Sequence, residues 1–329
     1  MKNYTITLET LTPVYIGSGM KITKKDFKLE KDYAYIYDPI KLHSILGISY
    51  ENFLTNSLSL TDYLGRNQHF NISSALKYSI SIGDKTIRKS DSIDEFLKDP
   101  YGYPYIPGSS IKGAIRTALL AYRINNETSK YARFKSQSID KWRNNGRDIE
   151  IAAFGNPQDS KFKNLRISDS KPIPKDSLIL SKKIDIFKDG ESNNKLNLCR
   201  ESICPGTKVY FDLTIEKDEF SIEEIIEAIK FFSRQYRENY LSKFNSFGKE
   251  KYEDNIIYLG GGTGFLTKTV NQSLYGAKTT KEVSQFLNKA FKWHKHYRDI
   301  EIGLSPRAKK CTKINGKTME MGISRIRID

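Results

Sequence analysis

Cysteine, histidine and long apolar runs are all scarce in this sequence, and each shortage excludes a class of protein. The chain has 3 cysteines and 4 histidines in 329 residues. Cys199 and Cys204 form no C-x-x-C pair and Cys311 lies far from both, which excludes a disulfide framework and a zinc site. No apolar run approaches the roughly 20 residues that span a bilayer, and the N-terminus MKNYTITLET lacks a secretory apolar segment. We therefore expect a cytoplasmic protein without a metal, a cofactor or a membrane partner.

Acidic residues are in the minority. The chain has 54 Lys and Arg against 39 Asp and Glu, which gives a net charge of +15 and a pI near 9.4. Such an excess favours a polyanionic partner, and without a membrane signal that partner is nucleic acid. Ordinary solubility charge is the alternative.

Alternating and helical periodicities predict the fold class. Strands are expected from Tyr4, from Tyr33, around Ile167, from Thr207 and at NIIYLG, and amphipathic helices follow Ser109 or Ser110 and Ser221. Strand, helix, strand, strand, helix, strand is the order of an α+β sandwich, which we expect to occur twice. The length suits two domains, which we place at 1–175 and 176–329.

Two polar regions interrupt this pattern. Residues 41–100 contain pieces such as KLHSILG, TDYLGR and SIDEFLK that are typical of short helices, so we interpret the region as a helical insertion. Residues 124–150 are polar and basic, which predicts a loop that is either mobile or ordered by a partner.

The stretch IPGSSIKGAIRT starts a helix with small residues. A helix start exposes unpaired backbone N–H groups, and Gly108, Ser109 and Ser110 leave that end open to an anion. Lys112 and Arg116 are one turn apart and face away from the apolar stripe, where they could hold a phosphate. The alternative is a plain serine cap with two solvated cations.

A second small-residue stretch, YLGGGTGFLTKT, follows an apolar strand. It nearly matches the phosphate-binding pattern G-x-x-x-x-G-K-T, but Thr267 stands where the second glycine is required. We therefore do not expect a nucleoside triphosphatase. Either this loop approaches a sugar-phosphate chain closely or it is only a tight turn. The candidate residues here are Gly261, Gly262, Thr263, Gly264 and Lys268.

Six stretches together resemble the RAMP superfamily of CRISPR-associated proteins. They are TPVYIGSG, YIPGSSIKGAIRT, LRISDSKP, ESICPGTKVYFDLTI, YLGGGTGFLTKT and LSPRAKKCTKINGKTMEMG. Within the superfamily they are most similar to the family that forms the fifth subunit of the Csm complex, the type III-A CRISPR effector. The resemblance covers both ends and the centre of the chain, but not residues 50–95 and 124–150.

The resemblance implies two ferredoxin-like, RRM-type domains with insertions. It also implies a non-catalytic subunit for antiviral defence that binds CRISPR RNA toward its 3′ end, caps the backbone filament formed by another Csm subunit, and supports maturation by recruited host 3′ exonucleases. By analogy, three segments would lie along the RNA backbone. They contain Gly17, Ser18 and Gly19, then Gly108, Ser109, Ser110, Lys112 and Arg116, then Gly261, Gly262, Thr263, Gly264 and Lys268, and Arg307 in the basic tail is added to them.

A catalytic alternative remains within the superfamily, namely an endoribonuclease that cleaves CRISPR repeat RNA. His43 and His69 lie in the insertion, and His294 and His296 are two residues apart and so point in different directions. Asp169 is the most prominent carboxylate, although a turn-forming aspartate explains it equally. Tyr101, Tyr103 and Tyr105 are candidates to stack bases, or form one face of a strand. We expect no catalytic residues.

Overall fold

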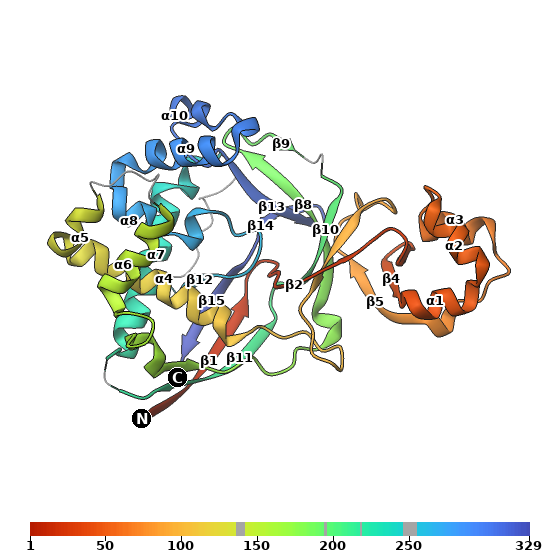
Figure 1. Cartoon of the computed structure of the whole chain (residues 1–329), viewed down its shortest axis with the longest axis horizontal. Helices are drawn as coiled ribbons and strands as arrows, with labels where there is room; N and C mark the ends of the chain where they lie inside the picture. The colour runs from red at the N-terminus through yellow and green to blue at the C-terminus, as the bar shows by residue number, and fades with distance from the viewer. Residues whose placement is uncertain (136–141, 194–195, 218, 246–254) are drawn as a thin grey trace.

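The computed structural model describes residues 1–135, 142–193, 196–217, 219–245 and 255–329. Two curled sheets form its centre, with most helices on one side of them and a small helical lobe at the opposite end (Figure 1).

The first sheet carries the order β12-β15-β1-β11-β7. Its strands are β1 (Lys2–Thr10), β7 (Leu165–Ile167), β11 (Lys208–Ile215), β12 (Ile256–Tyr258) and β15 (Ile323–Ile328). Along the chain β1, α4 (Gly108–Asn126), β7, β11, α7 (Ile222–Asn239) and β15 alternate as strand, helix, strand, strand, helix, strand, which is the ferredoxin-like unit. The predicted α+β class is confirmed.

The two helices of this unit form for the reasons that the sequence indicated. On α4 the side chains of Ile111, Ile115 and Leu119 are fully buried, one turn apart. The hydroxyl of Ser221 accepts the backbone N–H of Glu224 and starts α7. The two helices pack against each other, and the sheet lies beneath them.

The second sheet carries the order β2-β6-β10-β8-β5-β4-β3, and the far half of β8 also pairs with β13 and β9. Its strands are β2 (Gly17–Ile22), β3 (Phe27–Leu29), β4 (Tyr33–Tyr37), β5 (Leu76–Ile82), β6 (Ser92–Phe96), β8 (Leu178–Phe187), β9 (Ser192–Asn193), β10 (Leu198–Ile203), β13 (Ala308–Ile314) and β14 (Lys317–Glu320).

Both sheets draw strands from both sides of residue 175. The last strand, β15, lies beside the first, β1, so the two chain ends are neighbours (Figure 1). The division into 1–175 and 176–329 therefore does not coincide with the division into sheets.

The lobe at the far end is built from α1 (Pro39–Leu46), α2 (Ile48–Thr55) and α3 (Leu60–Arg66). It has its own small core, in which Leu42, Phe53 and Leu60 are fully buried. The segment SIDEFLK, expected to be helical, is instead strand β6. Its S-x-x-E pattern imitates a helix cap, but pairing with β10 and β2 buries Ile93 and Phe96, and this tertiary pairing decides the conformation.

Residues 124–150 are a second correction, because the described part is helical rather than a loop. Tyr131 and Phe134 are buried and anchor this segment; residues 136–141 lie outside the described residues. The remaining helices are α5 (Thr128–Lys135), α6 (Trp142–Phe154), α8 (Asn271–Tyr275), α9 (Thr279–Ala290) and α10 (Asp299–Ile302). Across the described residues, none of the helices combines the length and apolarity needed to cross a membrane.

Candidate nucleic-acid interface

Three chain segments meet at one end of the first sheet, and residues 260–264, called the glycine loop below, lie at their centre. The loop follows β12, and its Gly261 N–H donates to the carbonyl oxygen of Tyr15 at 2.8 Å. A Cβ atom at Gly260, whose φ is +77°, would lie 2.0 Å from that same oxygen. The group that approaches the glycine loop here is the carbonyl of Tyr15 in the same chain, and its approach to a sugar-phosphate chain stays a prediction.

The third segment is the turn before β15. The Gly322 N–H donates to the carbonyl oxygen of Pro13 at 2.8 Å, and the Leu259 N–H donates to the carbonyl oxygen of Gly322 at 2.8 Å. Residues 13–17, 259–264 and 321–322 thus form one connected junction.

A buried lysine holds the glycine loop from below. The Nζ of Lys309 on β13 donates to the carbonyl oxygen of Thr263 at 2.6 Å and pairs with Glu320 at 3.1 Å. Thr263 is fully buried, so this predicted contact residue positions the loop from inside and presents no surface.

Cations gather beside the junction, where the side chain of Arg200 is 11% exposed and two lysines are more exposed. Arg200 on β10 places its guanidinium 5.1 Å from the centre of the Tyr15 ring and its Nη1 3.0 Å from a Cβ built at Gly262. Lys268 and Lys310 are exposed near it. We call Arg200, Lys268 and Lys310 the cation cluster.

The lysine pKa values reflect partial burial first and the neighbouring charges second. Partial burial first, and then the charge of Arg200, lowers the pKa of Lys268. Partial burial, Lys183, Arg200 and Lys268 lower the pKa of Lys310, which Asp185 only partly offsets. An anion that binds beside such a lysine relieves the repulsion from the other cations and stabilises the charged form of the lysine.

The edge strand β2 extends the cluster. Lys21, Asp94 and Arg200 are register partners on β2, β6 and β10, with Lys21 Nζ 3.9 Å and Arg200 Nε 3.7 Å from Asp94 carboxylate oxygens. The predicted small-residue loop, Gly17, Ser18 and Gly19, lies on this strand. The Ser18 hydroxyl is bonded to Glu95, whereas Gly17 and Gly19 are exposed.

The start of α4 does receive an anion, but from the chain itself. The Gly108 N–H donates to Oδ1 of Asp169 at 2.9 Å. A Cβ at Gly108 would lie 2.2 Å from the carbonyl oxygen of Ile167. Gly108 is buried and Ser110 half-buried, while Ser109 is exposed, so the backbone end expected to bind phosphate already carries a carboxylate cap.

Lys112 and Arg116 project from the outer face of α4 as expected. Arg116 Nε lies 3.7 Å from a carboxylate oxygen of Glu150 on α6. Partial burial, then Arg116 and Arg166, lower the pKa of Lys112. A cavity of 130 Å³ lies between Thr117, Glu150 and Lys268, so α4 and the segment after the glycine loop are neighbours.

Arg307 contacts the segment after α9 and not the glycine loop. Its guanidinium donates to the carbonyl oxygens of Lys295 and His294 at 2.9 and 2.6 Å and pairs with the buried Asp299 at 2.8 Å. Arg307 therefore holds the segment after α9 in place rather than facing the glycine loop.

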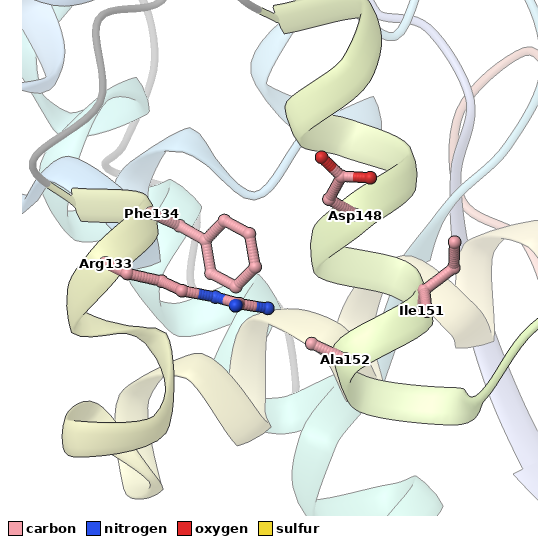
Figure 2. A pocket seen from close by; sticks show the side chains of 5 residues that line it. All are labelled: Arg133, Phe134, Asp148, Ile151 and Ala152. Carbon is pink, nitrogen blue, oxygen red and sulfur yellow. The ribbon is translucent and has the colours of Figure 1, made fainter.

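The described residues offer no metal cluster of three His, Cys, Asp or Glu side chains. Asp169, the most prominent carboxylate, is the helix cap. A pocket of 350 Å³ between α5 and α6 contains Arg133, which lies over Phe134, and Asp148 (Figure 2). Its lining side chains include no nucleophile and no second carboxylate, so this cavity lacks a catalytic arrangement.

Sequence reasoning missed Arg200, Lys310 and Lys21. Arg200 lies in a strand whose neighbours are buried, and Lys310 lies in an ordinary basic run, so neither carries a local motif. The alternation of Arg200 with buried Cys199 and Glu201 was the one available signal, because it places a cation on the outward face of a strand.

A sequence profile of the RAMP superfamily matches residues 7–292. The ferredoxin-like unit and its basic junction thus belong to a member of the RAMP superfamily.

Individual relatives narrow the assignment. CRISPR system Cms protein Csm5 of Streptococcus thermophilus is 32% identical over 298 residues, which cover 82% of this chain and 80% of the relative. The Csm5 of Mycobacterium tuberculosis H37Rv is 26% identical over 370 residues, covering 98% and 96%. The chain belongs to the Csm5 family of type III-A CRISPR proteins.

Solved structures agree on the fold. One chain of a cryo-EM structure of a type III-A Csm–crRNA–target RNA ternary complex superposes with a TM-score of 0.68 at 21% identity, over 98% of this chain and 100% of that one. The crystal structure of T. onnurineus Csm5 gives a TM-score of 0.63 at 19% identity, over 97% and 99%.

Proposed function

We propose that this chain binds CRISPR RNA as a non-catalytic subunit of a type III-A complex, and that the cation cluster beside the glycine loop holds the RNA backbone. The observation that carries the proposal is the proximity of Arg200, Lys268 and Lys310, since partial burial first and then the neighbouring cations lower the pKa of both lysines. Family membership supports it, and a structural neighbour belongs to a complex that contains CRISPR RNA.

The chemistry of the cluster fits a guide-binding subunit. A guide subunit must accept many spacer sequences, so it should hold phosphates and riboses rather than read base edges. Cations on β10, β13 and the segment after the glycine loop offer point charges, and the predicted contacts Gly262 and Gly264 are only half-buried beside them. Such a surface favours sequence-independent binding.

The finer roles come from the family resemblance. We infer that the chain binds toward the 3′ end of the CRISPR RNA, caps the filament of backbone subunits, and supports maturation by host 3′ exonucleases. The contact set is proposed to include Lys112 and Arg116 at the margin of the site.

Binding to two unrelated, unstructured RNAs across a salt series tests the proposal. Because each phosphate contact contributes about 0.7 to the slope of log affinity against log salt, the two exposed lysines of the cluster should give a slope of at least about 1.4. Both RNAs should bind with similar affinity. Binding of only one sequence, or a slope near zero, would contradict the proposal.

The same samples test the non-catalytic assignment. Repeat-containing RNA incubated with the chain should remain intact. Cuts that disappear in His294→Ala or His296→Ala would instead support the endoribonuclease alternative.

A further inference from the structure

The segment after α9 exposes an unusual number of aromatic side chains. Trp293 is 94% exposed, Tyr297 52% and Phe291 51%. We call these three residues the aromatic platform. Isolated exposed apolar residues are normal, but three exposed large rings within seven consecutive residues are a concentration that indicates a binding partner.

Cations are interleaved with these rings. Lys292, Lys295 and Arg298 are all exposed, and residues 289–298 contain no Asp or Glu. The nearest acidic side chain along the chain, Asp299, is fully buried and pairs with Arg307 and His296 at 2.8 and 2.9 Å. The platform therefore presents aromatic faces within a positive surface.

The backbone under the platform is fixed by side chains. Arg307 donates to the carbonyl oxygens of His294 and Lys295, and the Ser284 hydroxyl donates to the carbonyl oxygen of His296 at 2.7 Å. The rings of Phe291 and His294 stack with their centres 5.6 Å apart and their planes 16° apart. A surface that is already ordered loses little conformational entropy when a ligand binds.

The combination of exposed rings and cations fits single-stranded nucleic acid better than it fits a protein partner. Single-stranded nucleic acid is bound by aromatic side chains that stack on bases and by cations that follow the phosphates. Protein interfaces also use Trp and Tyr, but lysine is depleted there. Lys292 and Lys295 directly flank Trp293 and His294, so charge complementarity favours a polyanion whose units have flat faces.

We propose that the aromatic platform stacks unpaired bases of the RNA, as a second contact beyond the glycine loop. The inference rests on the proposed function, because the same RNA strand reaches both places. The ring of Phe265, directly after the glycine loop, stacks on Phe286 of α9 at 5.9 Å. Phe286 lies on α9, which ends at Ala290 directly before the platform, so this helix connects the two contacts.

Tryptophan fluorescence offers a direct test, because the chain contains only Trp142 and Trp293. In the Trp142→Phe variant of the whole 329-residue chain, titration with an unstructured oligouridylate should quench the emission of Trp293 to saturation. In the wild-type background Trp293→Ala should bind the same RNA about tenfold more weakly, which corresponds to about 1.4 kcal/mol. Trp293→Phe should retain most of the affinity, because it keeps a ring that can stack.

Two controls separate the possible outcomes. Tyr33→Ala removes a ring that is 48% exposed beside the helical lobe and should leave the affinity unchanged. Lys268→Ala with Lys310→Ala reports on the glycine loop alone. If that pair weakens binding while Trp293→Ala does not, the platform proposal is wrong and the proposed function stands. If no variant changes binding, both are wrong. If Trp293→Ala only prevents co-purification with other complex subunits, the platform is a protein interface.

Discussion

The glycine loop and the start of α4 have similar sequences and different surroundings. Both combine small residues with nearby cations, and both bring a backbone close to another backbone, since Cβ atoms at Gly260 and Gly108 would lie 2.0 and 2.2 Å from carbonyl oxygens. At α4 the anion is supplied by Asp169. At the glycine loop Arg200 has Asp94 as its acidic neighbour, 3.7 Å away, while Lys268 and Lys310 are exposed cations beside it. Small residues thus indicate close approach, and the neighbouring charges decide what is bound.

The first prediction tests whether both glycines are structural. Gly260→Ala should lower the free energy of unfolding by at least about 3 kcal/mol, because a backbone carbonyl cannot move aside and the positive φ adds strain. Gly108→Ala should cost about 3 kcal/mol for the first reason alone. Urea unfolding followed by circular dichroism measures both.

Gly113 on α4 is the matched control, because a Cβ there meets nothing within 4 Å. Gly113→Ala should stabilise the chain by about 0.5–1 kcal/mol through helix propensity. A loss below about 1 kcal/mol for Gly260→Ala would show that the junction rearranges readily.

The second prediction compares the cations of the two regions. Lys268→Ala with Lys310→Ala should reduce the salt slope for single-stranded RNA by about 1.4 and weaken binding about tenfold. Lys112→Ala with Arg116→Ala should have less than half that effect, because Glu150 lies 3.7 Å from Arg116 and already neutralises part of its charge. Fluorescence anisotropy across a salt series measures the RNA affinity of both double variants. A larger loss of affinity for the α4 variant would contradict the prediction.

The third prediction concerns Asp169 as the anion that the chain provides. Asp169→Asn should cost about 1 kcal/mol of stability, because the helix start loses a charged acceptor. RNA affinity should not fall. A folded variant that loses RNA binding would place Asp169 in the RNA site and strengthen the endoribonuclease alternative.

The strand and helix pattern of the first sheet could be predicted from the sequence. The alternation in β1 and β11 and the stripes of α4 and α7 are local signals, and they were correct. The interleaving of both sheets could not be predicted, because the pairing of β15 with β1 joins residues more than 300 positions apart. For the same reason SIDEFLK was mistaken for a helix, since only β2 and β10 reveal its conformation.

The candidate site was predictable in its backbone and not in its charges. The glycine loop and Lys268 have local patterns, whereas Arg200 becomes a neighbour of Gly262 only through β10. Lys112 and Arg116 follow from helical spacing, yet Glu150 reaches Arg116 from α6, within a stretch expected to be a loop. Arg307 lies in a basic tail, and only the fold shows that it supports residues 294–299.

The last and smallest prediction concerns the free energy with which the cluster opposes folding. The lowered pKa values of Lys268 and Lys310 mean that between the folded and the unfolded pKa the folded chain binds fewer protons. This destabilisation, which comes from partial burial first and then from the neighbouring cations, is therefore fully present at neutral pH and disappears as pH rises past the ordinary lysine pKa near 10.4. Because both side chains are exposed, solvent screening should limit it to about 0.5 kcal/mol or less.

Lys310→Met should accordingly raise the free energy of unfolding slightly at neutral pH and low salt, while weakening RNA binding. The gain should shrink in high salt and near pH 10.5, where the wild-type lysines lose their charge. Lys112 is not a suitable control site, because partial burial, Arg116 and Arg166 also lower its pKa. The matched control is the exposed Lys41 on α1 in the helical lobe. The stability change caused by Lys41→Met should not depend on salt or pH. Urea unfolding at two pH values and two salt concentrations separates the two sites. A variant at residue 310 that is less stable at low salt than wild type would mean that Asp94 and Asp185 already neutralise the cluster, and the difference between the glycine loop and the start of α4 would then disappear.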